Sequence, residues 1–196
     1  QKQFEIAELK LLVDAIQASK FITEKKSSQL IKKLTGMASE YEASQLKRQV
    51  VVQGRIKTMN ESIYYNVDDI HNAISNNRTI RFEYLRWDIS KKLVPRKNEL
   101  YEISPWVLTW SDENYYLIAY DENNEQIRHY RVDKMREVSV IDKKRKGKTE
   151  FNKQDRAKYN EQYFRMYGGE FATVTLRCEN EMANVIIDQF GRDVKL

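Results

Sequence analysis

Apolar side chains in the first third of the chain recur at intervals of three and four residues, which is the period of an α-helix. This pattern predicts a helix over residues 4–20 and a second helix that starts near Thr23 and ends at Gly36. A weaker helical pattern covers residues 39–48, and a clear one covers residues 67–75. Helices this short cannot bury their apolar faces alone, so we expect the four to form a small bundle.

After this bundle the hydrophobic pattern changes to a period of two, which is typical of strands with one buried face. Five such segments follow, separated by turn clusters rich in acidic residues and Asn, and they cover residues 80–84, 101–110, 115–120, 127–132 and 137–141. Short strands joined by tight turns favour a small antiparallel barrel over a sandwich or a parallel sheet.

The third predicted strand offers two alternating sets of side chains, and only one set can face the interior. We expect the more apolar set to fill the barrel, namely Tyr116, Ile118 and Tyr120 rather than Tyr115 and Leu117. On the second predicted strand Trp106 and Trp110 are four residues apart, which places both rings on one face. Large rings of this kind most often belong to a core.

Beyond the barrel the pattern predicts a third unit. A helix is expected over residues 155–166, followed by a strand over 172–178 and a helical pattern over 182–190. Because the sequence starts at Gln1 rather than at Met and stops at Leu196 within an apolar pattern, we expect a fragment. The predicted fold class is α+β, with a helical bundle, a small five-stranded antiparallel barrel and the start of an α/β extension.

Composition narrows the class of protein. The 196 residues include 41% hydrophobic and 32% charged side chains, too apolar for wholesale disorder. The single cysteine, Cys178, cannot form an intramolecular disulfide or a thiolate metal site, and we expect it to be a small residue of the core. No apolar stretch reaches the roughly 20 residues that span a bilayer, so we expect a cytoplasmic protein with no membrane partner. The net charge of +5 mildly favours an anionic partner.

Sequence patterns for catalysis are absent. The chain has no Gly-rich phosphate loop and no nucleophile elbow. Its two histidines, His71 and His129, fall in different predicted units, with no Asp or Cys at the spacing of a metal site. We therefore expect a binding protein rather than an enzyme, with no cofactor and no metal.

A series of short motifs runs in order through the predicted barrel. They are Ala73-Ile74, the strand Ile80 to Tyr84, the strand Tyr101 to Leu108 with Pro105 in its middle, the triplet Tyr115-Tyr116-Leu117, and the run Arg128 to Met135. In order and spacing, residues 70–141 resemble the WYL domain, a ligand-sensing module of bacterial transcriptional regulators. Two positions depart from that family's pattern: Tyr115 replaces the Trp of the triplet, and Lys134 stands where Arg is usual.

The resemblance implies an Sm-like, SH3-type barrel and a chain in four parts. The flanks look similar to the same family, so the implied parts are a helical linker over 1–65, a WYL domain over 66–148, a connecting helix over 149–168 and the start of a C-terminal extension over 169–196. It also implies a winged helix-turn-helix upstream of Gln1 that reads operator DNA. We expect the chain to form a homodimer.

Candidate ligand-binding residues come from the basic run at the end of the barrel. On an extended strand Tyr130 points to the interior, so His129 and Arg131 point to an open face, with Arg128 and Lys134 at its rims. Arginine forks suit phosphate, and an exposed aromatic ring suits a base. The expected stacking surface is Tyr115, and the further cationic candidates are Arg81 and Arg96.

These cations also have a structural explanation, because Arg131 and Asp133 are spaced to pair and charges on edge strands prevent aggregation. As ligand contacts, they favour a nucleotide or a short single-stranded nucleic acid. The predicted function is the effector-sensing and dimerisation part of a bacterial DNA-binding transcriptional regulator, which controls the attached DNA-binding domain allosterically. The alternative is a nucleic-acid-binding accessory module that regulates a nuclease or a defence system.

Overall fold

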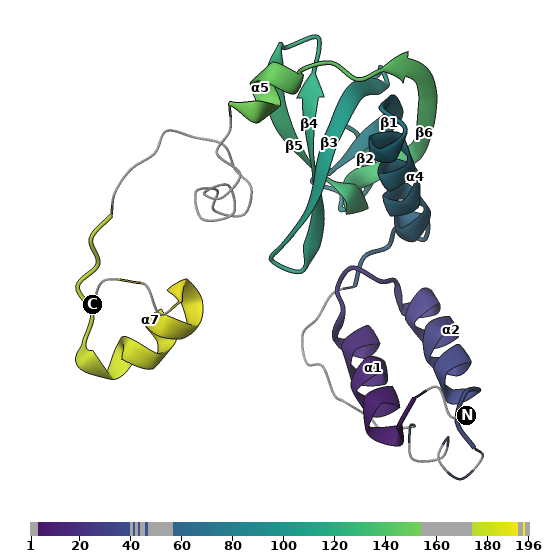
Figure 1. The fold of residues 1–196 in the computed structure, drawn as a ribbon, viewed down its shortest axis with the longest axis vertical. Helices are drawn as coiled ribbons and strands as arrows, with labels where there is room; N and C mark the ends of the chain where they lie inside the picture. The colour runs from purple at the N-terminus through teal and green to yellow at the C-terminus, as the bar shows by residue number, and fades with distance from the viewer. Residues whose placement is uncertain are drawn as a thin grey trace.

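Two helices that lie side by side form the N-terminal part of the protein (Figure 1). The structure, a computed structural model, describes residues 4–39, 41, 43, 46, 57–153, 174–191 and 194. Helices α1 (Ile6–Ala18) and α2 (Glu24–Thr35) confirm the first two predicted helices. The helix expected over residues 39–48 lies mostly outside the described residues.

The start of α2 shows why the chain turns where it does. Thr23 is the N-cap residue, and its hydroxyl oxygen accepts a hydrogen bond from the backbone N–H of Lys26 at 3.1 Å. This bond satisfies one of the backbone donors that a helix leaves unpaired at its first turn. The connection between α1 and α2 is therefore fixed at the start of α2.

Antiparallel strands form the centre of the molecule. The five predicted strands are confirmed as β1 (Arg78–Trp87), β3 (Tyr101–Ser111), β4 (Asn114–Asp121), β5 (Gln126–Arg131) and β6 (Met135–Lys144). They pair in the order β6-β1-β3-β4-β5. A further three-residue strand, β2 (Leu93–Pro95), pairs with the end of β1 and was not expected from the sequence.

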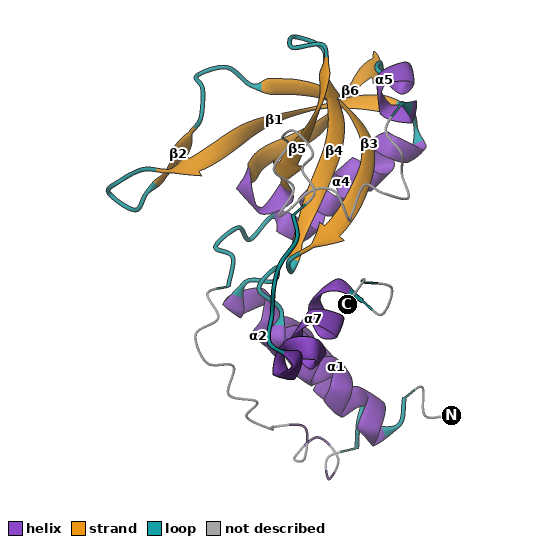
Figure 2. Ribbon diagram, turned by 90° about the vertical axis from the view of Figure 1, so that its left-hand side faces the viewer, coloured by secondary structure: helices purple, strands orange, loops and turns teal. Residues whose placement is uncertain are grey.

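The five longer strands curl into a half-barrel rather than a closed barrel (Figure 2). Within the part of the chain that the structure describes, β5 and β6 are not paired with each other, and the 3-10 helix η1 (Val132–Lys134) connects them. Near this gap the Tyr84 hydroxyl accepts a hydrogen bond from the backbone N–H of Arg131 at 3.1 Å. The α+β class and the antiparallel strands are confirmed, and the opening leaves one end of the sheet accessible.

Helix α4 (Ile63–Ser75) covers the inner face of the half-barrel. Its residues Ile63, Ile70 and Ala73 are buried in one cluster with Phe82 and Leu117 of the sheet. The expectation that this helix completes an N-terminal bundle is wrong. Removing apolar surface from water drives packing, and the concave sheet offers α4 a large apolar surface.

The outer face of the sheet has a smaller core of its own. Tyr116 and Ile118 pack there with Phe151 of the short helix α5 (Lys148–Asn152). On the other side of β4, Leu117 and Ala119 are fully buried in the main core. The expected assignment of the two faces is therefore wrong, because the Leu117 side fills the half-barrel and α5 covers the Tyr116 side.

A β-bulge separates the two tryptophans of β3. The register of β3 against β4 shifts between Pro105 and Val107. Trp106 packs on the outer-face cluster, whereas Trp110 lies opposite Tyr115 in the β3–β4 register and is 49% exposed. The prediction that both rings share a face is wrong, because a bulge adds one residue and inverts the alternation of side chains.

The C-terminal segment also differs from expectation. Helix α7 (Ala183–Phe190), preceded by the 3-10 helix η3 (Asn180–Met182), confirms the last helical pattern. Residues 174–178 do not form a strand, and Cys178 is exposed rather than part of a core. The helix expected over residues 155–166 lies outside the described residues. Among the described residues, no helix has the length and apolarity needed to cross a membrane.

Candidate ligand-binding cavity

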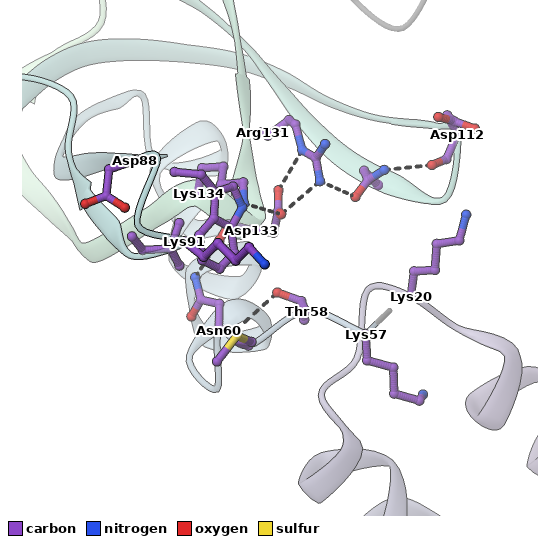
Figure 3. Close-up of a pocket in the computed structure, with 14 residues that line it drawn as sticks. Lys20, Lys57, Thr58, Asn60, Asp88, Lys91, Asp112, Arg131, Asp133 and Lys134 are labelled. Atoms are coloured by element: carbon purple, nitrogen blue, oxygen red, sulfur yellow. Dashed lines mark hydrogen bonds and ion pairs between the residues drawn. The ribbon is translucent and has the colours of Figure 1, made fainter. Parts of the chain in front are cut away.

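A cavity of about 610 Å³ opens where the half-barrel meets the N-terminal helices (Figure 3). Its walls come from the α1–α2 connection, the linker before α4, the β1–β2 hairpin, the β3–β4 turn, and the end of β5 with η1. Basic side chains outnumber acidic ones in this wall: Lys20, Lys57, Lys91, Arg131 and Lys134 against Asp88, Asp112 and Asp133. Cavities of roughly 300–1,000 Å³ are typical of small-ligand sites.

Arg131, the last residue of β5, is held in one orientation by two partners. Its Nε donates to Asp133 Oδ1 at 2.9 Å, and one terminal nitrogen donates to Asp133 Oδ2 and to Asn114 Oδ1, each at 2.9 Å. The side chain stays 40% exposed, while that of Asp133 is 10% exposed. The pair between Arg131 and Asp133 that the sequence allowed is thus present, and it leaves part of the guanidinium open to the cavity.

Lys134 contacts the same carboxylate. Its Nζ is 3.7 Å from Asp133 Oδ2 and 4.9 Å from the centroid of the Trp87 ring. Burial lowers the pKa of Lys134, although the neighbouring Asp133 acts in the opposite direction. The charged form of a desolvated amine is stabilised when an anion enters the cavity.

Lys91 stands on the turn that joins β1 to β2. The turn is fixed by Asp88, whose carboxylate accepts the Lys92 N–H at 2.8 Å and whose carbonyl accepts the Lys91 N–H at 3.1 Å. Lys91 has a positive φ of 61°. Its ammonium forms no hydrogen bond or ion pair within the described part of the chain. This amine is therefore available to a ligand.

The linker before α4 forms the floor of the cavity. Lys57 donates to the carbonyl oxygens of Ile16 and Ser19 and to the Ser27 hydroxyl, at 3.2, 2.9 and 2.9 Å. Burial lowers the pKa of Lys57. Three residues later, Asn60 donates its side-chain amide to the carbonyl oxygens of Asp133 and Met135, at 3.2 and 2.8 Å. One short segment thus contacts both the helical pair and η1.

Comparison with known families identifies the central part of the chain. Residues 65–140 match the family model of the WYL domain. The chain contains a WYL domain. No curated protein matches the chain. Ten chains of solved structures match it, among them proteasome accessory factor B/C (PafBC) of Arthrobacter aurescens, at 19% identity and a TM-score of 0.37. That match covers 74% of this chain and 22% of the PafBC chain.

Of the seven residues expected to bind ligand, the WYL domain places two in the cavity, Arg131 and Lys134. His129 shares the face of Arg131, but it lies opposite Ile118 in the register, beside the outer-face cluster. Burial lowers the pKa of His129 to about 4, so the imidazole is neutral at pH 7. His129 does not supply a positive charge to the cavity.

The other four residues do not line the cavity either. Tyr115 packs edge-on against Phe21 and Trp110, with ring centroids 4.7 Å from each. Three arginines lie elsewhere on the WYL domain: Arg128 at 3.6 Å from Asp121, Arg81 at 3.4 Å from Glu102, and Arg96, which is exposed after β2.

Lys91, Trp87 and Asn60 line the cavity and were not expected from the sequence. The signal for the first two was present, since an aromatic residue ends a strand directly before a turn with two adjacent lysines. Asn60 carried no local signal, because its partners are more than 70 residues away.

Proposed function

We propose that this chain is the ligand-sensing part of a bacterial transcriptional regulator, and that its cavity binds a nucleotide or a short single-stranded nucleic acid. The observation that carries the proposal is Lys91, whose ammonium has no partner in the described part of the chain and which lines one cavity with Arg131 and Lys134. Guanidinium and ammonium groups that converge on one cavity suit phosphate groups. The WYL domain supports a regulatory role.

The same contacts suggest how binding is transmitted. Asn60 is bonded to the carbonyl oxygen of Asp133, whose carboxylate holds Arg131. Lys57, on the same linker, is bonded to the end of α1 and to α2. A ligand that moves Arg131 and Asp133 therefore shifts the linker and, through it, the helical pair. The mechanism involves binding and no chemical step.

In this proposal the chain works as one of two copies, and operator DNA is bound by a winged helix-turn-helix domain outside the present sequence. Operator half-sites have a fixed spacing on DNA, so a shift of the helical pair that changes the spacing of the two DNA-binding domains changes operator affinity. Sedimentation equilibrium tests the dimer directly, and a monomer at all concentrations would contradict this part of the proposal.

Binding is tested by fluorescence anisotropy with a labelled single strand of about eight nucleotides and with a panel of cyclic dinucleotides, at about 50 and 200 mM salt. We expect Lys91→Gln to weaken binding roughly fivefold, about 1 kcal/mol, and to flatten the salt dependence. The matched control is Lys144→Gln, which removes an exposed lysine at the far end of β6 that does not line the cavity. Equal affinities for the two variants, or no binding by the wild type, would overturn the proposal.

Transmission is tested by hydrogen exchange with the bound oligonucleotide. We expect slower exchange in parts of α1 and α2 that do not line the cavity. Asn60→Ala removes one hydrogen bond to η1, one to Met135 of β6 and one from the Ser62 N–H, and it removes no charge. Although Asn60 lines the cavity, we expect this variant to lose less affinity than Lys91→Gln and to lose the remote protection. Remote protection that survives in Asn60→Ala would show that the linker does not carry the signal.

A further inference from the structure

Within the part of the chain that the structure describes, the indole of Trp87 differs from those of the other two tryptophans in having no aromatic neighbour. Trp106 is stacked on Phe151 with centroids 5.2 Å apart, and Trp110 packs edge-on against Tyr115 at 4.7 Å. Trp87 contacts no other aromatic ring among the described residues, is 49% exposed and lines the cavity. An exposed ring with a large apolar area is costly in water unless it has a partner.

The surroundings of Trp87 combine an apolar surface with positive charge. Leu93 lies opposite Trp87 in the β1–β2 register, and Met59, which is 75% exposed, contributes to the same cavity. The ammonium of Lys134 lies 4.9 Å from the ring centroid, and Lys91 stands four residues further along the hairpin. A phosphate alone makes no favourable contact with this apolar surface, whereas a base with an attached phosphate contacts both the apolar surface and the positive charges.

We propose that Trp87 is the stacking platform for an unpaired nucleobase, and that it makes the cavity select base-bearing anions over other anions. This inference rests on the proposed function and adds the feature of the ligand that is recognised. Stacking on an aromatic side chain requires an open base face, so the ligand is single-stranded or a free nucleotide rather than a duplex. The cations of the cavity bind the phosphates of the same ligand.

The test compares two labelled oligonucleotides of about eight units with equal numbers of phosphates, one of thymidines and one made only of abasic sugar phosphates. We expect the wild type to prefer the thymidine strand by roughly fivefold to a hundredfold. Trp87→Ala should bring this ratio close to one and leave the affinity for the abasic strand nearly unchanged. Trp87→Phe, which keeps a smaller ring, should give an intermediate ratio.

Trp110→Ala is the matched control, because it removes an indole of the same 49% exposure that does not line the cavity. It should retain the wild-type ratio. A ratio near one in the wild type, or equal losses in both alanine variants, would overturn the inference while leaving anion binding at the cavity intact. If neither strand binds the wild type, the proposed function fails and the inference fails with it.

Discussion

Two groups of basic side chains on the half-barrel have similar compositions and different surroundings. The first, here called the edge cluster, consists of Arg81, Lys143 and Lys146 with the carboxylates of Glu102 and Glu122. The second, the cavity cluster, consists of Lys91, Arg131 and Lys134 with the carboxylate of Asp133. In the edge cluster two carboxylates pair with all three cations, whereas in the cavity cluster the one carboxylate pairs only with Arg131 and Lys134.

Two lysines, one from each cluster, have opposite local electrostatics. The hydrogen bond to Glu102 raises the pKa of Lys143, so its surroundings favour the charged amine. Burial lowers the pKa of Lys134, so its surroundings disfavour the charged amine. A basic residue that is already neutralised stabilises the fold, whereas one that is desolvated and only partly neutralised is suited to a ligand. Sequence composition alone does not separate these two cases.

The largest expected effect comes from Asp133→Asn, which removes the only carboxylate of the cavity cluster. Arg131 and Lys134 lose their charged partner, and we expect the free energy of unfolding to fall by about 2–3 kcal/mol. Because the cavity becomes more positive, the affinity for single-stranded oligonucleotide should rise. Urea unfolding and anisotropy measure the two quantities.

The corresponding change in the edge cluster, Glu102→Gln, is the control for Asp133→Asn. Glu102 is more exposed, so we expect a loss of under about 1 kcal/mol and no change in oligonucleotide affinity. Weaker binding by Asp133→Asn would show that its carboxylate supports the ligand site by positioning Arg131 more than it opposes the ligand by charge.

A somewhat smaller loss of stability is expected at His129, which lies outside both clusters and becomes a cation when the pH is lowered. Its pKa of about 4 in the folded protein lies below the ordinary value of 6.5, so the unfolded chain binds the proton more tightly. Stability is therefore full above about pH 6.5 and falls as the pH is lowered toward 4. Between pH 7 and pH 5 we expect a loss of about 2 kcal/mol in urea unfolding.

His129→Gln should flatten this pH dependence between pH 7 and pH 5, a range above the titration of most carboxylates. An unchanged slope in the variant would assign the loss to other groups.

Lys134→Met should separate binding from stability. Burial already disfavours the charge of Lys134, so we expect a change in unfolding free energy within about 0.5 kcal/mol, since lost pairing and relieved desolvation offset each other. Oligonucleotide affinity should fall roughly fivefold, because one phosphate partner is lost. A large loss of stability with unchanged affinity would show that Lys134 stabilises the fold and does not bind the ligand.

For Lys143→Met, in the edge cluster, we expect the smallest effect and the opposite pattern, namely a small loss of stability with no loss of binding. Its exposed pairs with Glu102 and Glu122 contribute about 0.5 kcal/mol, and we expect no change in affinity. Thermal unfolding with and without about 1 M salt measures the contribution of these ion pairs to stability. At roughly this concentration, salt screens surface charges within a few ångströms. Weaker oligonucleotide binding by this variant would mean that the ligand site extends to the edge cluster.

The sequence by itself determined most of the described helices and strands and two of the residues that line the cavity. Periods of 3.6 and 2 predicted α1, α2, α4 and the five main strands, because these patterns depend only on neighbours in the chain. The same alternation predicted that Tyr130 faces the core, and the basic run identified Arg131 and Lys134. The order of short motifs indicated the WYL domain, which the family match confirms.

Only the tertiary structure decided which faces are buried and which distant residues meet. The bulge in β3 and the cover supplied by α5 set the environments of Trp106 and Leu117, and neither feature has a clear local signal. Lys57 reaches a carbonyl 41 residues away, and Asn60 reaches one 73 residues away. Contacts over such separations follow from how whole elements pack, because burial of apolar surface sets their positions before any single polar contact forms.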